Sequence, residues 1–264
     1  MQPAGLFVAR HHVDAPGPPV VLVHGAPDRS KNFAHVVHRL HDLPVTVYDR
    51  RGYGRSVEAG LNGHDTVLGG FDVHADDLID VLDGTPSVVC GQSAGGAIAM
   101  LAATKAPELF VALGVWEPPM VPWPWWMGDL AMERTMTWAR YGDASQLGED
   151  FNRFILGDER WDALRDSTKQ MLREEGRAFR ADMAFQAAPF MELDQLKVPF
   201  LVGCGTVAPE PLFLDAHRRV AELTRAELFI GEGADHFAHT NHPEIWVEFV
   251  RATVNLAMRS VEPH

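Results

Sequence analysis

The chain of 264 residues has few cysteines, few basic side chains and no long uninterrupted apolar run. Its two cysteines, Cys90 and Cys204, lie far apart in separate apolar runs, which argues against a disulfide framework and against a cysteine-ligated zinc site. The 23 lysines and arginines are outnumbered by 36 acidic residues, which gives a formal net charge of −13. Binding to nucleic acid or to an anionic membrane surface is therefore not expected.

The apolar runs are too short to span a membrane, and no basic segment precedes an apolar one at the start of the chain. We therefore expect a cytoplasmic protein whose partner is a small-molecule substrate. The composition is 46% apolar and 22% charged, which is typical of a globular chain with one large core. Nothing in it indicates an oligomeric state.

Short β-branched and apolar runs alternate with segments of helical periodicity. The predicted strands are Leu6 to His12, Val20 to His24, Val45 to Asp49, Ser87 to Gly91, Val111 to Trp116, Pro199 to Cys204 and Ala226 to Ile230. The predicted helices are Asn32 to Leu43, Asp72 to Leu82, Gly95 to Ala106, Leu212 to Leu223 and Glu244 to Met258. This alternation predicts an α/β fold with a mostly parallel, doubly wound sheet of about seven or eight strands.

One segment interrupts the alternation, because residues 121–196 contain no strand-like run and begin with a cluster of tryptophans and methionines. We interpret it as a helical cap inserted into a core formed by residues 1–120 and 197–264. Aromatic and methionine side chains form adaptable apolar walls, although they can equally be the ordinary core of a helical subdomain. The pocket-wall candidates are Trp123, Trp125, Trp126 and Met127.

The segment Gly91-Gln92-Ser93-Ala94-Gly95 follows a predicted strand and opens a predicted helix. This is the setting of a nucleophile elbow, in which a serine lies on a tight, strained turn between small residues. Ser93 is therefore the candidate nucleophile. The N–H of Ala94 and that of Ala26, which follows the strand ending at His24, are candidates for stabilising an oxyanion.

A general base is expected after a late strand, and the segment Gly231 to His236 directly follows the predicted strand that ends at Ile230. A carboxylate must then orient the His236 ring, with the chain order serine, acid, histidine. Glu117 lies just past a central predicted strand, and its rivals are Glu210 and Asp215 after a later one. Asp235 adjoins the histidine in sequence and is expected to point elsewhere.

A metal site is a weaker interpretation of the thirteen histidines. Two sets have three-residue spacing, namely His35, His38 and His41, and His236, His239 and His242. Neither set is accompanied by a carboxylate-bearing zinc motif, so we expect no metal and no cofactor.

Taken together, these segments resemble the α/β-hydrolase superfamily over nearly the whole chain. The resemblance rests on Val21-Leu22-Val23-His24-Gly25, the stretch Tyr48 to Ser56, the Ser93 elbow, and the His236 loop as far as Pro243. The pair Arg50-Arg51 together with Trp116-Glu117-Pro118-Pro119 is similar to a branch of uncharacterised hydrolases common in actinobacteria. The resemblance implies an α/β-hydrolase fold and a Ser-His-acid triad.

The sequence departs from the family pattern at two places. Family members often carry the triad acid after the strand that corresponds to Phe200 to Cys204, but the stretch Gly205 to Pro209 has no carboxylate and includes Ala208. Some members, notably haloalkane dehalogenases, instead carry a glutamate after the preceding strand, which favours Glu117. The second departure is that only one strand is predicted before Val20.

The function predicted from these residues is hydrolysis of an ester or lactone bond of a small apolar substrate through an acyl-enzyme on Ser93. A serine in this position argues against dehalogenase and epoxide-hydrolase chemistry, for which the superfamily uses an aspartate. Alternatives on the same triad are cofactor-free perhydrolysis of the haloperoxidase type, carbon–carbon bond hydrolysis and hydroxynitrile lyase chemistry. An alternative of a different class is a slow-turnover sensor that binds a ligand in the same pocket.

Overall fold

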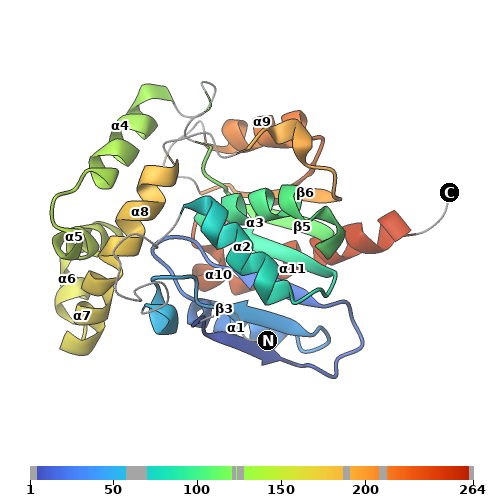
Figure 1. The fold of residues 1–264 in the computed structure, drawn as a ribbon, viewed down its shortest axis with the longest axis horizontal. Coiled ribbons are helices and arrows are strands. Elements are labelled where there is room, and N and C mark those ends of the chain that lie inside the picture. Colours follow the sequence, from blue (N-terminus) through green and yellow to red (C-terminus); the bar gives the residue numbers. More distant parts are fainter. Residues whose placement is uncertain are drawn as a thin grey trace.

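The computed structural model describes residues 5–57, 70–120, 123, 128–186, 191–207 and 213–261. Within them, the strands form one seven-stranded sheet in the order β1-β3-β2-β4-β5-β6-β7 (Figure 1). The strands are β1 (Val8–His11), β2 (Val20–Val23), β3 (Val45–Tyr48), β4 (Ser87–Gln92), β5 (Phe110–Trp116), β6 (Phe200–Gly205) and β7 (Glu227–Gly231). Each lies within one of the predicted strand segments or differs from it by one residue at an end.

Only β1 runs antiparallel to its neighbour β3 among these strands, and every other neighbouring pair is parallel. The predicted α/β class with a mostly parallel sheet is therefore confirmed. The carboxyl ends of β2 to β7 all meet one edge of the sheet, and the loops that follow them can bring side chains together there.

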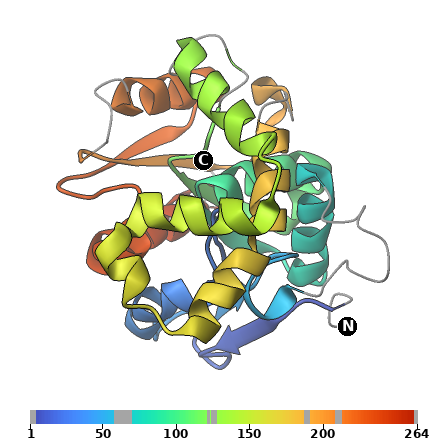
Figure 2. The ribbon, with the colours of Figure 1, turned by 90° about the vertical axis from the view of Figure 1, so that its left-hand side faces the viewer.

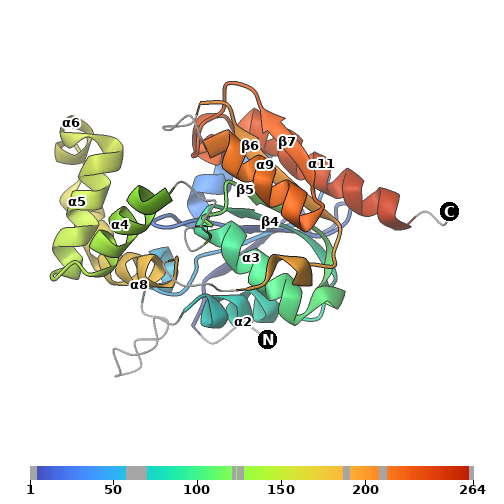
Figure 3. The ribbon, with the colours of Figure 1, turned by 90° about the horizontal axis from the view of Figure 1, so that it is seen from above.

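Helices cover both faces of the sheet, as Figures 1 and 3 show. One face packs against α2 (Phe71–Leu82), α3 (Ala94–Lys105) and α9 (Phe213–Thr224), and the other against α1 (Ala34–Arg39), α10 (Ala238–Asn241) and α11 (Pro243–Val261). The residues of β2 alternate between the two cores, with Val21 and Val23 on the α3 side and Val20 and Leu22 on the α11 side. A strand buried on both faces explains the unbroken apolar run of this segment.

The first helix is shorter than predicted. A 3-10 turn (Ser30–Phe33) leads into α1, which ends at Arg39, four residues before the predicted end at Leu43. The chain then turns with a hydrogen bond from Leu43 N–H to the Leu40 carbonyl, just before Pro44. A residue preceding proline is disfavoured in helical conformation, so the periodicity of this segment overestimated the helix.

Five helices lie between β5 and β6 in the described residues, and no strand lies there. They are α4 (Gly128–Ala139), α5 (Ala144–Leu156), α6 (Asp158–Asp162), α7 (Asp166–Glu174) and α8 (Gly176–Gln186), followed by a 3-10 turn (Leu193–Gln195). Figure 1 shows these inserted helices together on the left of the sheet, and Figure 2 shows them from that side, in front of the sheet. None of the described helices is long and apolar enough to cross a membrane.

A buried ionic cluster attaches α8 to the loop after β3. The Asp182 carboxylate is fully buried, accepts a hydrogen bond from the Arg50 guanidinium at 2.8 Å and one from the Tyr53 hydroxyl at 2.7 Å, and lies 3.5 Å from His74 Nε2. Burial alone raises the pKa of Asp182, but the Arg50 charge and the His74 hydrogen bond outweigh it and hold the pKa well below the usual 3.8. Asp182 is therefore an ionised anchor of the inserted helices.

A second buried pair lies close by in the same interface. Glu175, at the junction of α7 and α8, pairs with Arg29 from the loop after β2 and accepts the Gly54 N–H at 2.8 Å. Both side chains are at least nine-tenths buried. The inserted helices are thus attached to the core by two buried carboxylates that reach loops at the carboxyl edge of the sheet.

We expect Asp182→Ala to destabilise the folded protein by about 3 to 5 kcal/mol, because it leaves the Arg50 charge buried without its carboxylate. Urea denaturation monitored by tryptophan fluorescence measures this free energy of unfolding. The matched control is Asp215→Ala, which removes an exposed ion pair with Arg218 and should cost no more than about 1 kcal/mol.

The contribution of Asp182 to the stability of the folded protein depends on pH. Because the pKa of Asp182 is depressed in the folded state, its contribution to stability is fully present above about pH 4 and is lost as the pH falls through the folded pKa. If Asp182→Ala and Asp215→Ala lowered the free energy of unfolding by the same amount, the role of Asp182 as an anchor would be contradicted.

Candidate active site

Ser93 lies in the turn between β4 and α3 with φ 50° and ψ −124°, which is a strained backbone conformation for a residue with a side chain. The turn leaves no room for a side chain at the two glycines that lie two residues before and two residues after Ser93. A β-carbon on Gly91 would lie 2.5 Å from the Gly95 carbonyl oxygen, and one on Gly95 would lie 2.4 Å from the His24 carbonyl oxygen. The predicted strand-turn-helix geometry around Ser93 is therefore present, and the serine side chain is partly exposed.

Glu117 occupies the neighbouring position at the same edge of the sheet. Gln92 pairs with Trp116 in the parallel register of β4 and β5, so the next residues, Ser93 and Glu117, leave adjacent strands together. Backbone hydrogen bonds hold both residues in place. The Ser93 N–H donates to the Trp116 carbonyl at 2.8 Å, and the Glu117 N–H donates to the Gly203 carbonyl at 2.9 Å. Glu117 also has a positive φ of 46°, which is unfavourable for a residue with a side chain.

The Glu117 carboxylate joins β6 to the loop that carries His236. Its Oε2 lies 2.7 Å from His236 Nδ1, and its Oε1 accepts the Gly205 N–H at 2.9 Å and the Cys204 thiol at 3.5 Å. The glutamate is 1% exposed. Burial raises the pKa of the Glu117 carboxyl, but the hydrogen bond and charge of His236 outweigh it and bring the pKa below its usual value.

An ionised Glu117 fixes the tautomer of a neutral His236. The ring donates its Nδ1 proton to the carboxylate, and the basic lone pair then resides on Nε2. The His236 side chain is 27% exposed, whereas its partner is buried. The arrangement can thus present an oriented imidazole base at the edge where Ser93 lies.

The backbone N–H groups of Ala94 and Ala26 are the candidate donors of an oxyanion site. Ala94 is the first residue of α3, where helix geometry provides no intrahelical acceptor and where the helix dipole favours negative charge. Across the described part of the chain, neither the Ala94 nor the Ala26 N–H donates to another backbone group. Both can therefore act as donors to a ligand.

The loop before Ala26 is held by Arg50, whose side chain is fully buried. Its guanidinium donates to the His24 carbonyl at 3.0 Å and to the Gly25 carbonyl at 2.8 Å, and its backbone N–H donates to His24 Nε2 at 2.8 Å. Burial and the Arg50 charge lower the pKa of His24 to about 4, so this histidine is neutral at pH 7 and acts as a structural acceptor. The second arginine, Arg51, instead pairs with Asp77 on α2.

Of the two rival carboxylates only Asp215 can be placed, and Asp235, which adjoins His236, can be placed as well. Asp215 is exposed on α9 and pairs with Arg218 at 3.2 Å. Asp235 accepts the Phe237 N–H and the Asn241 side-chain amide, so it points away from the neighbouring imidazole as predicted. Glu210 lies outside the described residues, as does Ala208.

The histidine sets do not assemble into a ligand cluster within the described ranges, where no group of three metal-ligating side chains was found. His35, His38 and His41 are exposed on α1 and just beyond its end. His239 is buried and hydrogen-bonds through Nε2 to Asp28 at 2.8 Å. Both cysteines are unpaired and buried.

Trp123 is the one pocket-wall candidate that can be placed, and it packs, partly buried, against the core on the α3 side of the sheet. Trp125, Trp126 and Met127 lie outside the described residues. A cleft of about 580 Å³ lies between the inserted helices and the loops that follow Ala26 and flank His236. Most of its lining residues are polar, with charged side chains from both sides of the cleft, and the apolar ones include Phe154, Leu164 and Phe237.

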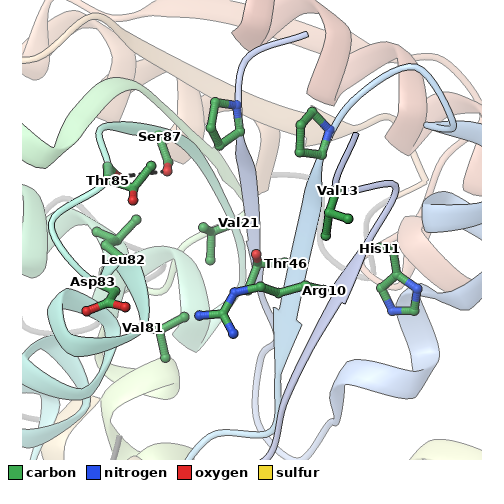
Figure 4. A pocket seen from close by; sticks show the side chains of 12 residues that line it. Arg10, His11, Val13, Val21, Thr46, Val81, Leu82, Asp83, Thr85 and Ser87 are labelled. Carbon is green, nitrogen blue, oxygen red and sulfur yellow. Dashed lines mark hydrogen bonds between the residues drawn. The ribbon is translucent and has the colours of Figure 1, made fainter. Parts of the chain in front are cut away.

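A second cavity of about 410 Å³ lies at the opposite edge of the sheet (Figure 4). Its lining includes Arg10, Pro19, Thr46, Asp83 and Ser87. Pro19 precedes β2 and Ser87 begins β4, so this cavity is at the amino ends of the parallel strands. Neither this cavity nor the cleft of about 580 Å³ is lined by Ser93, Glu117 or His236. The cleft reaches the site through Pro27, which follows Ala26, and through Asp235 and Phe237, which flank His236.

The sequence patterns did not predict two buried residues that contact the backbone and the carboxylate of this site. In the sequence, Arg50 stands out only as part of a double arginine and Cys204 only as a cysteine in an apolar run, yet Arg50 contacts the backbone of the site and Cys204 contacts its carboxylate. A charged residue directly after an apolar strand is the one signal that could have identified Arg50, because a buried charge needs partners.

Comparison with known proteins gives a consistent result. The profile described as "Alpha/beta hydrolase family" matches residues 20–249. The lipase LipV of Mycobacterium tuberculosis is 31% identical over 111 residues, which are 40% of this chain and 41% of that protein, so the match spans about two fifths of the relative.

Solved structures resemble the chain over nearly its full length. A bromoperoxidase from Bacillus anthracis superposes with a TM-score of 0.72 at 19% identity, covering 95% of both chains. An esterase from Thermogutta terrifontis superposes with a TM-score of 0.70 at 21% identity, covering 96% of this chain and 93% of the esterase. At such identities the likeness concerns the fold, and with the profile match across most of its length the chain belongs to the alpha/beta hydrolase family.

Proposed function

We propose that this hydrolase cleaves an ester or lactone bond of a small apolar substrate through a Ser93 acyl-enzyme. The observation that carries the proposal is the 2.7 Å contact between His236 Nδ1 and the buried Glu117 carboxylate, beside the strained turn of Ser93. A carboxylate, an imidazole and a serine at one sheet edge are the groups that acyl transfer requires.

In the proposed reaction, Ser93 Oγ attacks the carbonyl carbon while its proton passes to His236 Nε2. The N–H groups of Ala26 and Ala94 stabilise the negative charge that develops on the carbonyl oxygen. The imidazolium then gives its proton to the leaving alcohol oxygen, and the acyl group stays on Ser93. A water molecule, deprotonated by the same imidazole, attacks the acyl-enzyme and releases the acid.

The substrate is proposed to bind between the core and the inserted helices, with residues 121–196 acting as a cap. Phe154 is 68% exposed and Phe237 adjoins the proposed base, and both line the cleft in this interface. An exposed phenylalanine in a cleft favours apolar acyl or alcohol groups.

Labelling with a fluorophosphonate tests the mechanism directly, because such probes react with activated serines. We expect rapid modification of Ser93, located by peptide mass spectrometry, and loss of that reaction in His236→Ala. Slow labelling together with tight binding of an apolar ligand would instead favour the sensor interpretation. Steady perhydrolysis with acetate and peroxide, exceeding ester hydrolysis, would favour the haloperoxidase-type alternative.

We also expect the enzyme to prefer neutral acyl groups. The net charge of −13 repels anions, and the exposed Phe154 lines the cleft, so kcat/KM for an aryl butyrate should exceed that for the matching aryl hemisuccinate by about tenfold or more. Spectrophotometric assays of the two esters at low and high salt measure this ratio. Equal values for both esters would contradict the predicted preference.

A further inference from the structure

Gln92, the residue before the proposed nucleophile, makes a contact that the mechanism above does not use. It is the last residue of β4, and its side chain is 2% exposed. Its Nε2 donates a hydrogen bond to the backbone carbonyl of His236 at 3.0 Å, across 144 residues of sequence. The side chain therefore connects the strand that ends at Ser93 to the peptide group of the proposed base.

The direction of this side chain follows from strand geometry. Side chains alternate along β4, and Val88 and Cys90 belong to the core on the α11 side. Gln92 is two residues further on and therefore points to the same side, where α10 and α11 follow the His236 loop. A polar residue at this strand end can reach that loop, whereas an apolar one would offer it no hydrogen bond.

The loop after β2 leaves space for the same amide. A β-carbon on Gly25 would lie 2.1 Å from Gln92 Oε1 and 3.1 Å from the Ser93 β-carbon. The absence of a side chain at Gly25 therefore lets the Gln92 amide lie between the loop that carries Ala26 and the loop that carries His236. One buried side chain contacts all three segments of the proposed site.

We propose that Gln92 is a positioning residue that holds the backbone of His236 at the correct distance from Ser93. Glu117 contacts the imidazole ring at Nδ1, and this contact does not fix the peptide group of His236. The Gln92 amide fixes the peptide group of the same residue, so His236 is held from β4 and from β5. This role rests on the proposed serine mechanism.

The tests are Gln92→Met and Gln92→Glu. Methionine has similar length and lacks the donor, and glutamate keeps the shape but places an acceptor against the His236 carbonyl. We expect kcat to fall about 10- to 100-fold, because displacing a catalytic group by about 1 Å costs on that order, while KM changes by less than about twofold. The rate of Ser93 labelling by a fluorophosphonate should fall in parallel with kcat.

Ser87→Ala is the matched control at the other end of the same strand. Ser87 is also 2% exposed, and its hydroxyl donates to the Thr85 carbonyl at 2.9 Å, so its removal costs a buried hydrogen bond far from the site. We expect its melting temperature to fall as much as that of Gln92→Met, with kcat unchanged.

Each outcome separates this role from the proposed function. If the wild type is labelled at Ser93 and both Gln92 variants keep wild-type kcat and labelling rates, the positioning role is wrong and the mechanism stands. A loss of kcat in Ser87→Ala equal to that in Gln92→Met would reduce the effect to general destabilisation and also overturn the role. If Ser93 of the wild type is not labelled, both proposals fail.

Discussion

Ser93→Ala is expected to reduce ester turnover by about six orders of magnitude, the loss seen when the nucleophile of a serine hydrolase is removed. The variant has no oxygen to form the acyl-enzyme. The backbone N–H groups and the binding cleft remain, so a small residual rate above that of water should persist.

The fold should tolerate this substitution. Alanine keeps the β-carbon, so the positive φ at this position is no more strained than with serine, and the lost hydroxyl belongs to a partly exposed side chain. Circular dichroism and thermal melting should therefore match the wild type closely. Substrate binding, measured by calorimetric titration with an ester substrate, should also remain.

The variant separates a nucleophile from other roles of the same site. Turnover near the wild-type level would exclude an acyl-enzyme on Ser93 and shift the mechanism to a metal or to directly activated water. Loss of activity together with loss of folded structure would contradict the expectation that the hydroxyl has no structural role.

Local sequence patterns predicted the strands and the sheet edge that carries Ser93, Glu117 and His236. Ser93 and Glu117 directly follow apolar strands, and His236 lies in the loop that follows β7. Parallel strands bring their carboxyl ends together, so strand order along the chain was sufficient to predict proximity. The contact between Glu117 and His236 was therefore predictable across 119 residues of sequence.

Contacts made by the inserted helices were not predictable in this way. Arg50 and Asp182 are 132 residues apart, and nothing in the periodicity of α8 indicates that one aspartate on it is fully buried against the core. Long-range pairs of this kind depend on how helices pack, which short-range patterns do not specify. The same limit applies to Gln92, whose partner is a backbone carbonyl and leaves no mark in the sequence.

Glu117→Gln is expected to lower kcat by about 10⁴-fold, which corresponds to about 5.5 kcal/mol of transition-state stabilisation. The reason is that each of the two carboxylate oxygens accepts a hydrogen bond from a different group. Oε1 accepts the Gly205 N–H at 2.9 Å and Oε2 faces His236 Nδ1 at 2.7 Å, so both oxygens act as acceptors in a residue that is 1% exposed. A glutamine has one acceptor and one donor for these two places.

Either orientation of the new amide harms the site. If its oxygen stays on the Gly205 N–H, its NH₂ group faces His236 Nδ1, which must then be unprotonated. The imidazole proton moves to Nε2, and the ring can no longer accept the proton of Ser93. If the amide is reversed, two donors face each other at Gly205 in a buried position, and the folded protein is destabilised.

Turnover of Glu117→Gln, measured with its melting temperature and beside Asp215→Asn and Glu210→Gln, tests this assignment. Asp215 is exposed and pairs with Arg218, so its amide variant should keep kcat within about twofold of the wild type. We expect the same of Glu210→Gln.

A fully active Glu117→Gln enzyme would show that His236 does not need this carboxylate for its tautomer. Loss of activity in one of the other two variants would then transfer the role of the acid to the segment after β6, whereas full activity in all three would favour a Ser-His dyad or the sensor. The buried contacts of Glu117 on both oxygens favour the first outcome, in which this variant alone loses turnover.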